Sequence, residues 1–313
     1  MSIAFIFPGQ GSQAVGMGAE LAKAYSAAKA VFDEVDSALS QDLSRLMWEG
    51  PENELTLTEN AQPALMAVSL AAMRVLEERG FDLSAKAAYV AGHSLGEYSA
   101  LAAAGALSLA DTARLLKTRG RAMQEAVPVG QGAMAALLGA DLAQAQDLAK
   151  AAAEGEVCEA ANDNAPGQVV ISGAKAAIER AVALAPKFGA RRAVLLPVSA
   201  PFHCALMQPA AEAMRTALAG VTIKPPAVPL VANVLASPIS DPEAIRTRLV
   251  EQVTGMVRWR ETMLYLKANG VSAVYEVGAG RVLTGIARRF DGLAAQSIGM
   301  PDELEAAAVA LQT

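Results

Sequence analysis

The sequence predicts an α/β protein with a mostly parallel sheet and a smaller domain inserted into it. Three observations support this fold class. Short apolar runs of strand length alternate with helical stretches, which is typical of a parallel sheet covered on both faces. A Gly-x-Ser-x-Gly run lies between one such strand and the next helix. From Gly130 the order of elements changes to strand, helix, strand, strand, helix, strand.

Size and composition predict a well-buried protein that does not bind nucleic acid. The chain has 313 residues, enough for one large core or two domains. Hydrophobic residues make up 53% and the mean hydropathy is +0.29, which argues against disorder. The aromatic content of 4% and the net charge of −6 argue against a nucleic-acid binder, which would be basic and rich in stacking side chains.

The sequence predicts no metal centre, no disulfide framework and no membrane segment. Cys158 and Cys204 lack the spacing of either a metal site or a framework, so we expect a reducing, cytoplasmic location. The apolar run Ile3–Phe7 is too short for a signal peptide. Residues 87–110 carry one formal charge, Glu97, but their Gly, Ser and His content favours a buried strand-turn-helix over a membrane span.

The first part of the chain predicts two strands and three helices. Pro8 ends the first strand, Gly80 caps the C-terminus of the first helix, and Asp111 is the expected N-cap of the third. The expected elements are a strand over Ile3–Phe7, a helix over Gln62–Arg79, a strand over Ala87–Ala91, a helix over Leu95–Ala104 and a helix from Asp111 through Ala126.

The middle of the chain predicts a ferredoxin-like unit of about 70 residues. Its expected elements are a strand over Ala133–Leu138, a helix over Asp141–Ala153, strands over Val157–Ala161 and Gln168–Ser172 joined by the turn Asn162–Gly167, a helix over Ala174–Phe188 and a strand over Arg191–Val198. We therefore expect a small domain formed by residues 130–198, inserted into a large domain formed by residues 1–129 and 199–313.

The last part of the chain returns to alternating strands and helices. The expected elements are a helix over Ala205–Leu218, a strand over Pro229–Val234, helices around Pro242–Val253 and Arg258–Asn269, a strand over Ala273–Val277 and a last helix near Arg281–Arg289. A glycine turn, Gly278–Gly280, precedes that last helix.

The run Gly92-His93-Ser94-Leu95-Gly96 is the most informative motif. A serine between two glycines, after a strand and before a helix, is typical of a nucleophile elbow that exposes the serine hydroxyl. Glycine is needed where the tight turn brings backbone segments together, because a Cβ would clash there. The free N–H groups at the start of the helix could stabilise an oxyanion beside Ser94.

A nucleophilic serine needs a base, and the chain contains only two histidines, His93 and His203. Side chains next to each other on a sharp turn diverge, so we expect His93 to point into the fold. His203 lies at a break between a strand and a helix, where catalytic side chains are common, and is the predicted base. No acid stands out as its partner, so a neutral oxygen such as a backbone carbonyl could orient the imidazole instead.

Several motifs together resemble the malonyl-CoA:acyl-carrier-protein transacylases of type II fatty-acid synthesis. The resemblance covers nearly the whole chain, in order and at the family's spacing. It is carried by Phe7–Gln13, Gly92–Tyr98, Lys117–Gly120, Met123-Gln124, Pro166–Gly173, Val198–Met207 and Tyr275–Gly278. Gly278-Ala279-Gly280 departs from it, with alanine where the family often has proline.

The resemblance implies a hydrolase-like large domain with a ferredoxin-like insert, and ping-pong transfer of malonyl through a serine ester. It implies malonyl-CoA as substrate and an acyl carrier protein as partner. The sequence itself indicates no cofactor, and we expect a monomer. By this resemblance, Ser94 is the nucleophile and His203 the base, and the backbone carbonyl of Gln252 orients His203. The backbone N–H groups of Gln10 and Leu95 form an oxyanion hole. The residues implied to bind the substrate are Arg119, Phe202, Met123 and Gln62.

The sequence by itself leaves the role of Arg119 open, because it could be an exposed helical arginine as Arg114 and Arg121 are expected to be. A guanidinium suits the malonyl carboxylate because it can donate two parallel hydrogen bonds. Phe202, next to His203, is expected to narrow the acyl pocket. Two alternatives to a transferase are a serine hydrolase, either thioesterase or lipase-like, and a non-catalytic scaffold that keeps the fold.

Overall fold

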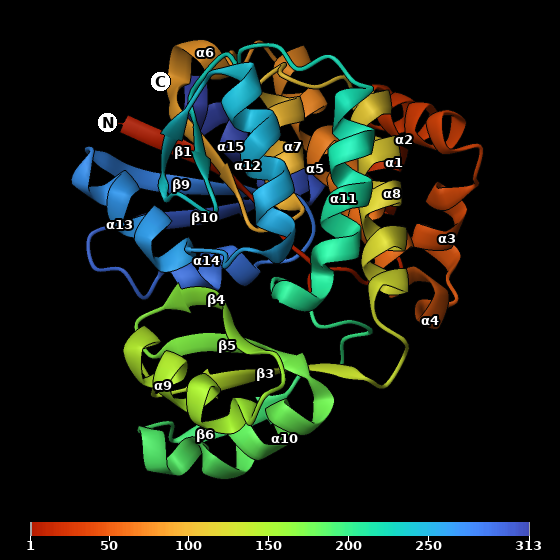
Figure 1. Ribbon diagram of the computed structural model, residues 1–313. Coiled ribbons are helices and arrows are strands. Elements are labelled where there is room, and N and C mark those ends of the chain that lie inside the picture. The colour runs from red at the N-terminus through yellow and green to blue at the C-terminus, as the bar shows by residue number, and fades with distance from the viewer. Residues whose placement is uncertain (1, 313) are drawn as a thin grey trace.

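The computed structural model describes residues 2–312 and contains two separate β-sheets (Figure 1). The larger sheet has six strands in the order β10-β9-β1-β2-β7-β8. All neighbours pair in parallel except β8, which runs antiparallel to β7. Its strands are β1 (Ser2–Phe7), β2 (Ala87–Gly92), β7 (Leu230–Ala232), β8 (Ser237–Ile239), β9 (Val271–Val277) and β10 (Ala294–Ile298). The mixed α/β class with a mostly parallel sheet is confirmed.

The apolar run of β1 explains why this strand lies at the centre of the large sheet. Phe5 and Phe7 point into the larger hydrophobic core, whereas Ala4 and Ile6 point into a second core on the opposite face. Both faces of a parallel sheet must be covered by helices, so the buried residues of such a strand, here Ala4 to Phe7, are apolar. Because β1 pairs in parallel with β2, the C-terminal ends of the two strands lie side by side, and the Ser94 turn begins there.

Helices cover both faces of the large sheet. The core on the Phe5 side is built with α1 (Ala19–Ala24), α2 (Ser26–Leu39), α3 (Leu43–Glu49), α4 (Glu52–Leu55), α5 (Thr58–Glu78), α6 (Leu83–Lys86), α7 (Gly96–Ala103), α8 (Leu109–Ala126), α11 (Gln208–Ala219), α12 (Pro242–Thr254) and α15 (Pro301–Gln312). The opposite core is built with α13 (Trp259–Ala268) and α14 (Val282–Ala287).

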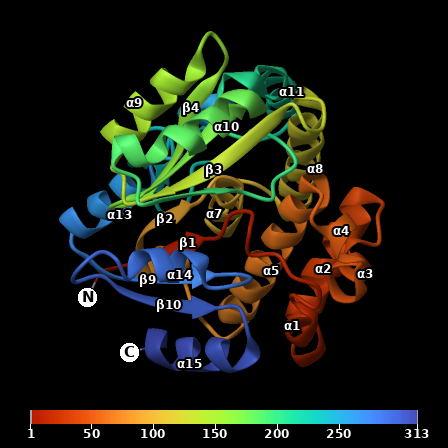
Figure 2. The ribbon, with the colours of Figure 1, turned by 90° about the horizontal axis from the view of Figure 1, so that it is seen from below.

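The smaller sheet is fully antiparallel, with the order β4-β5-β3-β6. Its elements are β3 (Gly132–Leu138), α9 (Leu142–Ala153), β4 (Cys158–Ala165), β5 (Gln168–Ala174), α10 (Lys175–Leu184), the 3-10 helix η1 (Ala185–Phe188) and β6 (Arg192–Leu195). Figures 1 and 2 show α9 and α10 on one face of this sheet. Ala135 and Leu137 of β3 pack toward these helices, whereas Met134 points to the opposite face, where the functional cavity lies.

The predicted turn over Asn162–Gly167 is wrong in most of its length. β4 continues through Ala165, and only Pro166 and Gly167 form the turn to β5. Asparagine and aspartate are poor strand formers, which is why the pattern favoured a turn. The strand forms because the side chains of Asn162, Asp163 and Asn164 are all buried in the folded chain. Asp163 also forms an ion pair with Arg260 on α13 at 2.8 Å.

Other boundaries also differ from the predictions. Ser108, not Asp111, caps α8, because its Oγ accepts the N–H of Asp111 at 3.1 Å. The strands predicted over Arg191–Val198 and Pro229–Val234 are shorter in the structure, where they are β6 and β7. After α14 the chain forms β10 and α15, neither of which was predicted. The 3-10 helix η2 (Ala205–Met207) precedes α11, and helices α1–α4 fill a region for which no element was predicted.

Candidate active site

Ser94 lies on a sharp turn between β2 and α7, as the motif predicts. Its backbone has a φ of 53°, the left-handed conformation that a non-glycine residue rarely adopts. The flanking glycines make the turn possible. A Cβ on Gly92 would lie 1.9 Å from the backbone of Gly96, and a Cβ on Gly96 would lie 2.2 Å from the carbonyl oxygen of Phe7.

Replacing Gly92 with alanine is expected to destabilise the fold by more than about 3 kcal/mol, because the added Cβ meets backbone that cannot move aside. Thermal or urea unfolding would measure the effect. Gly285→Ala is the matched control, because the Cβ there meets no atom within 4 Å. That variant should be as stable as the wild type or more so. Equal stability of the two variants would contradict the close packing of the turn.

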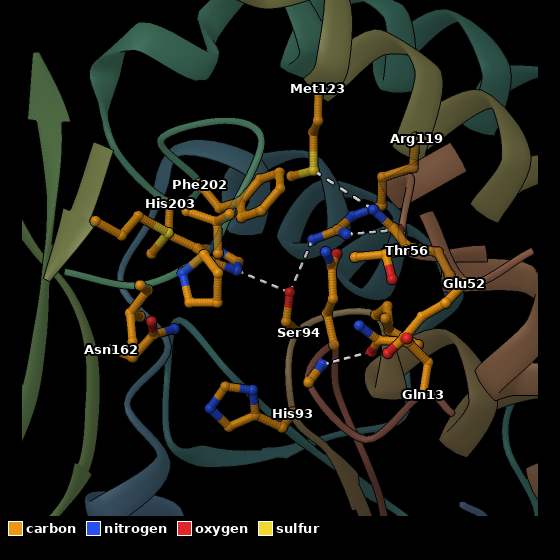
Figure 3. A pocket seen from close by; sticks show the side chains of 18 residues that line it. Gln13, Glu52, Thr56, His93, Ser94, Arg119, Met123, Asn162, Phe202 and His203 are labelled. Atoms are coloured by element: carbon orange, nitrogen blue, oxygen red, sulfur yellow. Dashed lines mark hydrogen bonds between the residues drawn. The ribbon is translucent and has the colours of Figure 1, made fainter. Parts of the chain in front are cut away.

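His203 faces Ser94 across the cavity (Figure 3). Its Nε2 lies 2.7 Å from Ser94 Oγ, and its Nδ1 lies 2.9 Å from the carbonyl oxygen of Gln252 and 3.2 Å from that of Gly255. Because both partners of Nδ1 are carbonyl oxygens, Nδ1 carries the proton and donates. Nε2 is then free to accept the Ser94 hydroxyl proton. The orienting group is thus a pair of carbonyls rather than a carboxylate.

Burial lowers the pKa of His203 to about 3, and the charge of the nearby Arg119 acts in the same direction. The side chain is 3% exposed. Losing water disfavours the charged imidazolium, so the imidazole is neutral at neutral pH. A neutral imidazole is the form that can accept a proton.

His93 does not take part in this pair. Its Nε2 bonds to Oδ1 of Asn164 at 2.8 Å, and its ring packs edge-on against Trp259 with centroids 5.5 Å apart. Figure 3 shows the ring directed away from the Ser94 hydroxyl. His93 thus points away from the Ser94 hydroxyl, as expected, but it is half-buried and lines the same cavity.

Arg119 is a buried side chain aimed at Ser94, and it is only 1% exposed. Nη2 donates to Ser94 Oγ at 3.2 Å and to Gln252 Oε1 at 2.9 Å, while Nη1 donates to Gln62 Oε1 at 2.7 Å. Nε has no hydrogen-bond partner in the described chain, and no carboxylate within residues 2–312 forms an ion pair with this guanidinium. Arg119 therefore has donor capacity for an anionic group placed beside Ser94.

Gln252 contributes both its backbone and its side chain. The carbonyl binds His203, and Nε2 donates to the Ser94 carbonyl at 2.9 Å and to Glu97 Oε2 at 2.5 Å. Glu97 is buried in the first turn of α7, and burial raises its pKa to about 7. Glu97 directly follows the Gly92–Gly96 motif, and the motif by itself indicates no role for it.

Gln10 and Leu95, the predicted backbone donors, lie at the cavity beside Ser94. Gln10 and Leu95 both line it, and neither N–H donates a hydrogen bond within residues 2–312. Leu95 is the N-cap of α7, where N–H groups have no partner within the helix. The Gln10 side chain is fixed separately, because its Oε1 accepts from Thr58 Oγ1 at 2.7 Å. Both N–H groups are therefore without a partner in the described chain.

A cavity of about 560 Å³ joins these groups between the two sheets. The cavity is lined by Met123 and by Phe202, whose side chain is 9% exposed. Gln62 also lines it, and its Nε2 donates to Thr58 Oγ1 at 2.9 Å and to Met123 Sδ at 3.8 Å. Further residues that line the cavity come from the smaller sheet and from the segment that follows β6, namely Met134, Asn162, Leu196, Pro197 and Val198. Glu52 and Thr56 also line the cavity. The unusual polar run after Ala161 was the available signal for Asn162.

Within residues 2–312, no group of three or more His, Cys, Asp or Glu side chains is arranged to hold a metal ion. In the same part of the chain, no helix is long and apolar enough to cross a membrane.

The fold and this cavity are those of an acyltransferase. The model of the family described as the acyl transferase domain matches residues 4–298 of the chain. The malonyl CoA-acyl carrier protein transacylase of Escherichia coli strain K12 is 48% identical, and the alignment covers 97% of this chain and 98% of that protein. The protein of the same name from Bacillus subtilis strain 168 is 46% identical over 99% of this chain and 96% of its own length. The chain therefore belongs to the malonyl CoA-acyl carrier protein transacylase family.

Solved structures agree with this membership. An acyl-carrier-protein S-malonyltransferase from Bartonella henselae superimposes with a TM-score of 0.98 at 57% identity, covering all of both chains. A malonyl-transacylase solved in complex with its type II PKS acyl-carrier protein superimposes with a TM-score of 0.95 at 43% identity, covering 99% of this chain and 100% of that one.

Proposed function

We propose that this chain transfers malonyl from malonyl-CoA to the phosphopantetheine thiol of acyl carrier protein, in fatty-acid biosynthesis, through a malonyl ester of Ser94. One observation carries the proposal. The Ser94 hydroxyl lies within hydrogen-bond distance of both a neutral imidazole and a buried guanidinium inside one cavity. The first can activate the hydroxyl, and the second can hold the carboxylate that distinguishes malonyl from a simple acyl group.

In the first half-reaction, His203 Nε2 takes the Ser94 proton as Oγ attacks the thioester carbonyl carbon of malonyl-CoA. The negative charge that develops on the carbonyl oxygen is stabilised by the N–H groups of Gln10 and Leu95. The carbon–sulfur bond then breaks, and the His203 proton goes to the departing coenzyme A thiolate. The Gln252 carbonyl, bound to Nδ1, keeps Nε2 directed at the reacting atoms.

The second half-reaction reverses these steps with a different thiol. His203 takes the proton of the phosphopantetheine thiol, the thiolate attacks the malonyl ester, and Ser94 regains its proton. Arg119 holds the malonyl carboxylate throughout, with Gln62 fixing one end of the guanidinium. Met123 and Phe202 bound the acyl group as apolar walls.

We further propose a division into a hydrolase-like large domain, residues 1–129 and 199–313, and a ferredoxin-like insert, residues 130–198. The order β4-β5-β3-β6 with α9 and α10 on one face supports the insert, and the strand-turn-helix at Ser94 supports the hydrolase-like domain. The absence of a cofactor, the monomeric state and the cytoplasmic location remain predictions from the sequence.

The function is tested by intact-protein mass after brief mixing with malonyl-CoA, for the wild type and Ser94→Ala. We expect a malonyl adduct on the wild type alone, discharged by holo-acyl carrier protein and only slowly by water. An adduct that water removes quickly, with the carrier protein making no difference, would indicate a thioesterase. A wild type that forms no adduct would contradict the proposal.

The low pKa of His203 predicts an unusually flat acid side of the pH profile. Because the folded-state pKa is about 3, the imidazole stays neutral as the pH falls from 8 to 5. An unshifted pKa near 6.5 would leave only about 3% neutral imidazole at pH 5. The rate at which an uncharged fluorophosphonate labels Ser94 should therefore fall by much less than thirtyfold over this range. A sigmoidal loss centred near pH 6.5 would show that His203 is not shifted.

Phe202 is expected to exclude a methyl branch on the acyl group, because its ring lines the cavity next to His203. Phe202→Ser should raise kcat/KM for methylmalonyl-CoA relative to malonyl-CoA by about tenfold, as one methyl group in an apolar pocket discriminates by about 1–3 kcal/mol. Steady-state kinetics with both substrates measures the ratio. An unchanged ratio would rule out the steric argument.

A further inference from the structure

Glu97 is a buried carboxyl group, bound to the Gln252 side-chain amide, for which the proposed reaction has no use. It is 1% exposed, and its Oε1 has no hydrogen-bond partner within residues 2–312. Its Oε2 accepts from Gln252 Nε2 at 2.5 Å and from the Asn233 N–H at 3.4 Å. Burying a carboxyl group with an unpaired oxygen is costly, so a compensating role is expected.

The contacts of Glu97 decide which way the Gln252 amide faces. Nε2 points to three acceptors, Glu97 Oε2, the Ser94 carbonyl and, at 3.4 Å, Asn233 Oδ1. Oε1 points to Arg119 Nη2 at 2.9 Å. A flipped amide would place an oxygen against those acceptors and an N–H₂ group against the guanidinium. Both contacts would be repulsive, so Glu97 selects the orientation that offers an acceptor to Arg119.

This orientation in turn holds the guanidinium toward Ser94. Gln252 Oε1 binds Nη2 and Gln62 Oε1 binds Nη1, so two neutral oxygens fix the group. Neither contact neutralises the positive charge of Arg119. In its ionised form, Glu97 also attracts that guanidinium through the Gln252 amide without occupying its donors. A direct ion pair would instead compete with a substrate carboxylate.

We propose that Glu97 is a positioning residue for acyl-group selection, acting through the Gln252 side-chain amide to hold Arg119 ready for the malonyl carboxylate. The proposal rests on the proposed function, in which Arg119 binds that carboxylate. It separates the two parts of the site. The Ser94–His203 pair reacts with any acyl group, and the chain Glu97–Gln252–Arg119 recognises a carboxylated one.

A purely structural role for Glu97 predicts a different outcome. Asn233, which donates to Glu97, also accepts the Ser94 N–H at 2.8 Å and donates to the Gly92 carbonyl at 2.7 Å. If Glu97 only supported this turn, its loss would disturb Ser94 and slow every reaction of the hydroxyl. Carboxylate recognition and Ser94 reactivity must therefore be measured on the same variant.

The test uses Glu97→Gln in the full chain, with two readouts. The first is KM and kcat for malonyl-CoA with holo-acyl carrier protein, and the second is the rate of Ser94 labelling by an uncharged fluorophosphonate. We expect KM for malonyl-CoA to rise about tenfold, which corresponds to the loss of one good polar interaction. The labelling rate should stay within about twofold of the wild type. An unchanged KM, or an equal loss in both readouts, would overturn the proposal.

Two further variants keep the result interpretable. Glu276→Gln is the matched control, because Glu276 is also fully buried but caps α14 through the N–H groups of Leu283 and Thr284, so KM should not change. If Glu97→Gln does not fold, Glu97→Asp keeps the carboxyl group but shortens the side chain, which withdraws it from Gln252 Nε2. The same selective rise in KM supports the proposal, and an unselective loss overturns it.

Arg119→Ala, measured in parallel, separates this inference from the proposed function. If Arg119→Ala loses preference for malonyl-CoA and Glu97→Gln does not, only the role of Glu97 is wrong. If Arg119→Ala also keeps the preference, the proposed binding of the carboxylate by Arg119 is wrong, and the role of Glu97 is overturned with it.

Discussion

Replacing His203 with alanine is expected to slow the acylation of Ser94 by malonyl-CoA by at least about 10⁴-fold. Within residues 2–312, His203 Nε2 is the base that lies against Ser94 Oγ, at 2.7 Å, and without it the hydroxyl proton has no acceptor of suitable basicity. The readout is the rate of malonyl adduct formation in a rapid-quench experiment followed by mass spectrometry.

The matched control is the other histidine of the chain. His93→Gln should slow acylation by less than about tenfold, because His93 bonds to Asn164 and packs on Trp259 rather than on the hydroxyl. A larger loss in His93→Gln than in His203→Ala would show that the proton acceptor lies elsewhere.

Replacing Arg119 with alanine is expected to lower kcat/KM for malonyl-CoA by about 10³-fold. Each charge-assisted hydrogen bond between a guanidinium and a carboxylate contributes about 1.5–3 kcal/mol, and two such bonds would be lost. Acetyl-CoA has no carboxylate, so kcat/KM for that substrate should change far less. The preference for malonyl over acetyl is therefore the quantity to measure, by adduct formation with each substrate.

Arg114→Ala is the control on the same helix. Arg114 is exposed and pairs with Asp111, so its removal should leave both substrates unaffected. Arg119→Lys should recover only part of the preference, because an ammonium cannot form the two parallel bonds of a guanidinium. An Arg119→Ala enzyme that loses malonyl-CoA and acetyl-CoA activity equally would indicate a general structural role instead.

Ser94, His203 and Arg119 show how far sequence reasoning reaches into the site. Ser94 stands out because its motif requires a strand, two glycines and a helix in a fixed order, and all of these are local features. His203 follows because the chain offers only one alternative histidine and the turn directs that one elsewhere. Arg119 was left open on the residues alone, because Arg114 and Arg121 share its helix and no local pattern decides which arginine is buried.

The sequence by itself determined the α/β class, the central apolar strand β1, the Ser94 turn and the order of elements in the smaller sheet. Each of these depends on residues within a few positions of one another, through periodicity, chain stiffness and the clash of a Cβ in a tight turn. Helices α5 and α8 were predictable for the same reason, apart from their first residues. The misplaced cap of α8 arose because Ser108 and Asp111 are both good capping residues and stand three positions apart.

Only the tertiary structure decided how distant polar groups meet. It kept Asn162, Asp163 and Asn164 in a strand, because each finds a site or a partner on another part of the chain, at the cavity, Arg260 and His93. It also brought Glu97 and Gln252 together, although 155 positions separate them, and aimed the amide at Arg119. A buried polar group is stable only with a partner, and partners so far apart in the chain come into contact only when the whole chain has folded.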